Sequence, residues 1–127
     1  MRCLAWLMLV LAAIPAHACT YARDVRPEQW HQWAAALFTG QVDTIQSEQE
    51  RQRPIDVITL RVLETFKGPQ GASATAMLRM PERVRVACGL ALPRAGDELL
   101  VGLDAQGNAA WVPLKPAYLE ALRAARK

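Results

Sequence analysis

The sequence has few of the residues that build catalytic and metal sites. Its 127 residues include three cysteines and two histidines, and one of each lies in the first 18 residues. It contains no HExxH, GxSxG or phosphate-loop pattern, and no cysteine–histidine pair suited to nucleophilic catalysis. The sequence therefore lacks the signatures of zinc proteases, serine hydrolases and phosphate-loop enzymes. We expect a protein without enzymatic activity, cofactor or intrinsic metal.

Aromatic residues and unbalanced charge are also scarce. Phe, Trp and Tyr make up 6% of the chain, and the formal net charge is +3. Proteins that bind single-stranded nucleic acid stack bases on aromatic side chains within a strongly basic groove. We therefore expect no nucleic-acid partner, and the small basic excess says little about other partners.

The sequence lacks an apolar run long enough to cross a bilayer. Its longest run covers residues 4–14 and ends at Pro15, whereas a membrane-spanning helix needs roughly 20 apolar residues. The run follows a basic start and precedes an A-x-A cleavage site at residues 16–18. This pattern predicts a signal peptide over residues 1–18, no membrane span, and an exported domain over residues 19–127, periplasmic or secreted.

Cleavage after residue 18 would leave two cysteines, Cys19 and Cys88, in an oxidising compartment. We predict a disulfide between them, which would close a loop of about 70 residues and stabilise the fold by roughly 4 kcal/mol. The alternative is a lipoprotein signal, in which the Cys19 thiol is acylated. Such signals usually carry Leu three residues before the cysteine, where this chain has Ala16. Acylation would also leave Cys88 unpaired.

Residues 19–127 have mainly β patterns between two helices. RPEQWHQWAAALF at residues 26–38 predicts a short helix with one apolar stripe. A strand is expected from Leu37, then an exposed turn in QSEQERQR, then a long strand over residues 54–68. Shorter strands are expected at ATAMLRM, RVRVA, DELLVGL and AAWV, and a C-terminal helix over residues 115–127. Several short strands at close spacing indicate a barrel or sandwich.

Several short motifs follow one another in a characteristic order. A cysteine at the predicted mature N-terminus precedes FTGQV, then ETFKGP at residues 64–69, then Cys88-Gly89 and GDELLVGL. This order resembles the bacterial form of the netrin-like (NTR) module, which is related to the N-terminal domain of tissue inhibitors of metalloproteinases. The resemblance covers nearly all of residues 19–112. It implies a five-stranded OB-type barrel with Cys19 bridged to Cys88, so we expect a mainly β fold with a short helix near each end.

The resemblance also implies an inhibitory edge at Cys19, Thr20 and Tyr21. In the inhibitors, the α-amine and carbonyl of the first cysteine chelate the protease zinc, and the next side chain enters the specificity pocket. A neutral α-amine suits a catalytic zinc with an open position. However, Tyr21 stands where those inhibitors have a second cysteine. We expect an exported binding module for a protein or cell-envelope component, with a zinc metalloprotease inhibitor as the alternative.

The remaining candidate residues are charged. Four arginines near the middle of the chain form a candidate surface for an anionic partner, or a solvated rim. They are Arg79, Arg83, Arg85 and Arg94. His31 is expected at the surface or at a helix end. Asp97 and Glu98 are neighbours on a predicted strand, so they should point to opposite faces and form no general acid/base pair.

Overall fold

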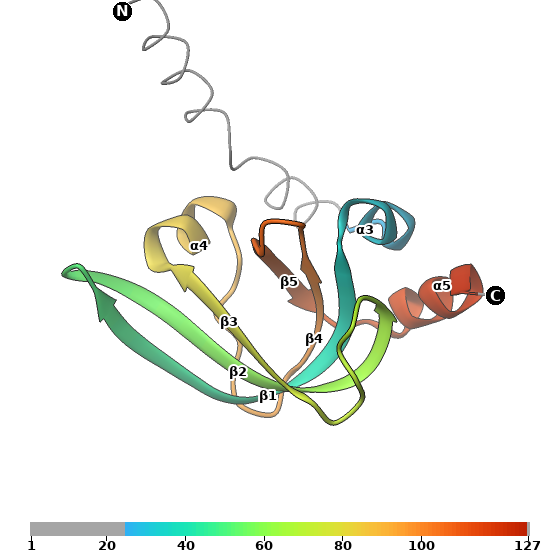
Figure 1. The fold of residues 1–127 in the computed structure, drawn as a ribbon, viewed down its shortest axis with the longest axis horizontal. Coiled ribbons are helices and arrows are strands. Elements are labelled where there is room, and N and C mark those ends of the chain that lie inside the picture. Colours follow the sequence, from blue (N-terminus) through green and yellow to red (C-terminus); the bar gives the residue numbers. More distant parts are fainter. Residues whose placement is uncertain (1–24, 127) are drawn as a thin grey trace, which may run out of the picture.

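The computed structural model describes residues 25–126 of the chain (Figure 1). Three short helices separate and flank two groups of strands, and the strands contribute most of the ordered backbone. In chain order they are α3 (Pro27–Trp33), β1 (Ala36–Glu50), β2 (Arg53–Lys67), β3 (Thr75–Pro81), α4 (Glu82–Cys88), β4 (Glu98–Leu103), β5 (Ala109–Pro113) and α5 (Pro116–Arg126).

All five strands belong to one antiparallel sheet with the order β3-β2-β1-β4-β5. The central strand β1 pairs with β2 from Leu37–Lys67 to Glu50–Arg53, and with β4 from Ala36–Leu103 to Gln41–Glu98. The outer strands β3 and β5 approach each other, but within residues 25–126 no ladder joins them. The expectation of a mainly β fold with five strands is confirmed, whereas the sheet is open and a closed barrel is not observed.

The long β1–β2 ribbon bends strongly along its length (Figure 1). Its register shifts at three places, between Leu37 and Phe38, between Thr39 and Gly40, and between Val42 and Thr44. Such irregularities bend a strand and increase its twist. Gly40 also permits a close approach, because a Cβ atom there would lie 2.7 Å from Leu60 Cδ1. The bent ribbon therefore wraps around apolar side chains on its inner face.

Two apolar clusters pack on opposite faces of the sheet. Alternation along β4 separates them, because Leu99 and Val101 join one cluster and Leu100 joins the other. The first cluster is completed by Cys88 of α4 and by β1, β2, β3 and β5. The second lies under α3 and α5, which contribute Trp30 and Leu122. The helices α3 and α5 thus cover one side of the sheet, and α4 covers the other.

Three sequence-based expectations about element bounds were wrong. The helix α3 ends at Trp33, so Leu37 of the predicted apolar stripe belongs to β1. QSEQERQR is largely strand: β1 continues to Glu50 and β2 begins at Arg53. Paired strands satisfy their own backbone hydrogen bonds, so they extend beyond the core with exposed polar side chains. RVRVA was expected as a strand and lies in α4.

Candidate functional site

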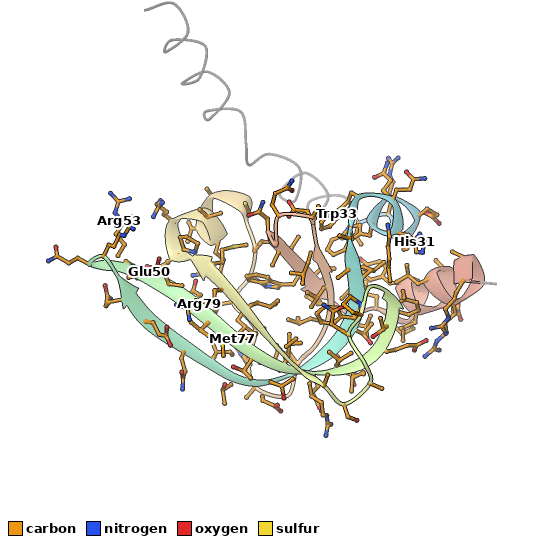
Figure 2. The ribbon with its side chains drawn as sticks, in the orientation of Figure 1. His31, Trp33, Glu50, Arg53, Met77 and Arg79 are labelled. Atoms are coloured by element: carbon orange, nitrogen blue, oxygen red, sulfur yellow. The ribbon has the colours of Figure 1, made fainter. Side chains whose placement is uncertain are left out.

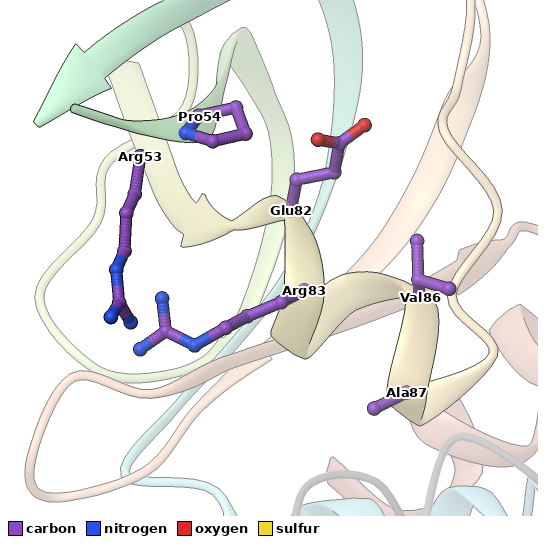
Figure 3. Close-up of a pocket in the computed structure, with 6 residues that line it drawn as sticks. All are labelled: Arg53, Pro54, Glu82, Arg83, Val86 and Ala87. Atoms are coloured by element: carbon purple, nitrogen blue, oxygen red, sulfur yellow. The ribbon is translucent and has the colours of Figure 1, made fainter.

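A groove separates the tip of the β1–β2 hairpin from α4, and we call it the hairpin–helix groove (Figure 3). Its first part has a volume of about 550 Å³ and is lined by Arg53, Pro54, Glu82, Arg83, Val86 and Ala87. Its second part, of about 490 Å³, shares Arg53 and Arg83. The other residues that line it are Glu50, Arg51, Ile55 and Pro81. The two arginines therefore stand where the two parts meet.

The hairpin side of the groove is set by a tight turn. Glu50 and Arg53 are paired across the ladder, and the two residues between them, Arg51 and Gln52, have φ angles of 51° and 65°. Two-residue hairpin turns with positive φ at both positions usually take Asn or Gly. Here the long ladder holds longer side chains in that conformation. The turn places Arg51 and Arg53 at the groove.

The helix side of the groove is set by buried contacts on the opposite side of α4. Arg85 Nε donates to Asp56 Oδ2 of β2 at 2.5 Å, and Arg85 Nη1 donates to the Leu90 carbonyl at 3.2 Å. Cys88 packs into the first apolar cluster. The helix ends at Gly89, whose φ of 70° is the left-handed conformation that favours glycine. With Arg85 and Cys88 turned inward, Arg83 remains on the exposed side.

Two of the arginines that line the groove, Arg53 and Arg83, differ from Arg79 because the described residues provide no acidic partner for them. Arg79 bonds to Glu48 at 3.1 Å and to Glu50 at 3.7 Å (Figure 2). For Arg53 and Arg83, no carboxylate of residues 25–126 lies within ion-pair distance. Their side chains extend into the same part of the groove, and Glu82 points away from them (Figure 3). Two positive charges therefore share one site.

The structure divides the four arginines that the sequence grouped together. Arg79 and Arg85 are compensated by carboxylates, so they do not belong to an uncompensated basic surface. Arg94 is exposed in the turn before β4, where its backbone N–H donates to Asp97 Oδ2 at 2.9 Å. Of the four, Arg83 lines the groove. Its neighbour there, Arg53, was not predicted as a site residue, because it lies in the segment QSEQERQR, which was expected to be an exposed turn.

The other titratable candidates have structural surroundings. His31 is half-buried in the last turn of α3, and its carbonyl accepts a hydrogen bond from Lys67 Nζ at 3.0 Å. The Asp97 carboxylate is engaged in its turn, and Glu98 is exposed at the start of β4. Among residues 25–126, no three His, Cys, Asp or Glu side chains are grouped so that they would hold a metal ion.

The predicted N-terminal features lie outside the described residues. These are the signal peptide, Cys19, Thr20 and Tyr21. Cys88 is 5% exposed and is disulfide-bonded in the structure, while its pairing with Cys19 stays a prediction. No helix within residues 25–126 has the length and apolar character needed to cross a membrane.

Comparisons with known proteins give no assignment. No protein-family model matches the chain, and no curated protein matches it. The resemblance to the netrin-like module therefore depends on the short motifs and their order.

Proposed function

We propose that the chain is an exported, non-enzymatic binding module for another protein or a cell-envelope component. We further propose that its sheet is an OB-type barrel that is open between β3 and β5. Two features support this finer description of the fold. The order β3-β2-β1-β4-β5 would become a barrel if β3 and β5 paired, and side chains of both strands, such as Leu78 and Trp111, already pack in one cluster. OB-type barrels commonly serve as binding folds.

The observation that carries the proposed function is the composition of the hairpin–helix groove. It combines arginines that have no acidic partner among residues 25–126, Arg53 and Arg83 among them, with the exposed apolar side chain of Val86. Arg53 and Arg83 make no ion pair with residues 25–126, and Val86 is 63% exposed. Convergent charges beside exposed apolar surface are typical of recognition sites.

The alternative, inhibition of a zinc metalloprotease through Cys19 and Thr20, finds no added support in the described residues. A change at the N-terminus tests this alternative directly. One extra Ala before Cys19 would move the α-amine away from the Cys19 carbonyl and prevent chelation, without changing the thiol. Strong inhibition of zinc proteases that disappears with the added Ala would favour this alternative over the binding module.

A capture experiment tests the proposed function. The protein beginning at Cys19 is immobilised and incubated with an envelope extract of the source cells, and bound components are eluted with an excess of the free protein. We expect a component that elutes competitively and that then binds the purified protein saturably. The control is the same protein unfolded by reduction and heat. Absence of any competitively eluted component would contradict the proposed function.

A further inference from the structure

We propose that the hairpin–helix groove binds an extended acidic peptide segment of the partner. In this assignment, an Asp or Glu carboxylate of the segment lies between Arg53 and Arg83, and a neighbouring apolar side chain packs on Pro54 and Val86. The inference rests on the proposed function, because it names the class of ligand that the binding module would take.

The charges of Arg53 and Arg83 are complementary to a carboxylate. Arg53 and Arg83 line the same hollow and extend into the same part of it (Figure 3). Like charges at close range repel each other unless an anion lies between them. A carboxylate accepts two parallel N–H bonds from a guanidinium, and such charge-assisted pairs are among the stronger hydrogen bonds in proteins. Elsewhere the fold supplies this anion itself, as Asp56 does for Arg85. Here the partner would supply it.

Apolar surface lies beside these charges. Val86 is among the few large apolar side chains in residues 25–126 that are mainly exposed, at 63%. It lies on the same side of the groove as Ala87, with Pro54 across from them on the hairpin. A short apolar patch next to a pair of cations fits a segment in which one acidic and one apolar residue are close together.

The acidic side chains of the groove favour a peptide over a phosphate-rich surface such as a lipid membrane. Glu82 and Glu50 also line the groove, and they would repel a membrane surface, where many negatively charged phosphates lie close together. A carboxylate brings a single charge, and a peptide also brings backbone N–H donors for these glutamates. The second part of the groove continues past Arg53 along Ile55 and Pro81, which leaves room for an extended chain on either side of the carboxylate.

Peptide selection tests this assignment without knowledge of the partner. A random displayed peptide library is selected on the protein beginning at Cys19 and counter-selected on its Arg53→Gln/Arg83→Gln variant. We expect the selected peptides to share an Asp or Glu next to an apolar residue. Synthetic labelled copies are then titrated by fluorescence anisotropy. Replacing the shared acidic residue by its amide, or Arg83 by Gln, should each weaken binding about tenfold, the usual effect of losing one charge-assisted hydrogen bond.

The matched control is Arg94→Gln, which removes the same charge at another place. The turn of Arg94 is bonded to Val42 through Gly96 N–H and Asp97 C=O at 2.7 and 2.8 Å. Val42 precedes Glu50 by eight residues, on the order of 25 Å along a strand. Arg94→Gln should therefore leave peptide binding unchanged. Equal losses in Arg83→Gln and Arg94→Gln would overturn the assignment, because they would indicate nonspecific charge attraction.

Two further outcomes would also overturn it. Selected peptides without a shared acidic residue would contradict the carboxylate site. Binding to vesicles containing acidic phospholipids, lost in the Arg53→Gln/Arg83→Gln variant and unmatched by any peptide, would assign the groove to a membrane surface. The capture experiment distinguishes this inference from the proposed function. A component that native protein and the double variant capture equally well would support the binding module but contradict the assignment of the groove as its binding site.

Discussion

The end of the sheet covered by α3 and α5 and the end formed by the hairpin tip and α4 use charged residues differently. At the first end, Arg123 and Arg126 of α5 both bond to Glu64 of β2, at 2.7 and 2.8 Å. These pairs attach a helix to the sheet. At the second end, Arg53 and Arg83 line a groove without an acidic partner among the described residues. The arginines of α5 are thus compensated within the fold, whereas Arg53 and Arg83 are available for a ligand, although Arg85 and Arg79 at the same end are bonded to carboxylates.

The same contrast occurs within α4 over a distance of two residues. Arg85 is bonded to Asp56, and the two side chains are 14% and 9% exposed. Arg83 is exposed and faces the groove. A buried carboxylate needs its partner, because an uncompensated buried charge is strongly destabilising. An exposed arginine without an ion pair contributes little to stability. The comparison therefore predicts which substitutions affect folding and which affect binding.

The largest loss of stability is expected at the α3–α5 end, from Trp30→Ala. Trp30 is fully buried in the second apolar cluster, and its ring packs edge-on against Trp33 at a centroid distance of 5.3 Å. Truncation of a buried Trp costs about 3–5 kcal/mol. Urea unfolding measures the change. The control is Val86→Ala in the groove, which should change the free energy of unfolding by less than about 0.5 kcal/mol. Equal losses of stability in the two variants would contradict the proposed difference between the two ends of the sheet.

The next largest loss of stability is expected from Cys88→Ser, which removes the predicted disulfide between α4 and Cys19. Loss of a native disulfide from a small exported domain typically costs about 2–5 kcal/mol. Thermal unfolding measures the loss, and intact mass with thiol titration measures the state of the native protein. That protein should begin at Cys19 with a free amine and no titratable thiol. A lipid adduct on Cys19 would instead support the lipoprotein signal.

A smaller, pH-dependent effect is expected from Glu64→Gln. The hydrogen bond from Arg123 is the main cause that lowers the pKa of Glu64 below its ordinary value of 4.5, and Arg126 adds to it while burial opposes it. A lowered pKa in the folded state stabilises the protein above pH 4.5, and this contribution is lost as the pH falls through the folded-state pKa. Wild type should exceed Glu64→Gln by up to about 1 kcal/mol at neutral pH.

Urea unfolding at several pH values checks this prediction. The difference between wild type and Glu64→Gln should shrink below pH 4.5 and with added salt, since partly exposed ion pairs are screened. A difference that stays constant across pH would mean that Glu64 stabilises the fold by packing and not by charge.

The strands with strong apolar patterns were predictable from the sequence. The long strand expected over residues 54–68 is β2, and DELLVGL and AAWV correspond to β4 and β5. Burial on one or both faces imposes these patterns. The strand prediction for RVRVA was wrong because Arg and Val alternate there, a pattern that is typical of a strand. In the structure the segment lies in α4, which buries Cys88 and directs Arg85 to Asp56. Glu82, an acidic residue in the first turn, and Gly89 after Cys88 were the local signals of a short helix.

The groove was less predictable than the fold. Arg83 was a candidate from the sequence, but its pairing with Arg53 was not predictable, because the two are brought together by the hairpin and α4, which are far apart in the chain. Nor does the sequence distinguish Arg83 from Arg85. The distinction depends on Asp56, which β2 places at 2.5 Å from Arg85. Partners of this kind are set by tertiary structure and not by local pattern.

The most direct measurement of the central claim compares Arg85→Gln with Arg83→Gln by urea unfolding. The two changes remove the same charge from the same helix. We predict that Arg85→Gln lowers the free energy of unfolding by about 3 kcal/mol, because it leaves Asp56 buried without its partner. Arg83→Gln should change it by less than about 0.5 kcal/mol. Equal losses in the two variants would contradict the claim that the fold uses Arg85 and leaves Arg83 for a ligand.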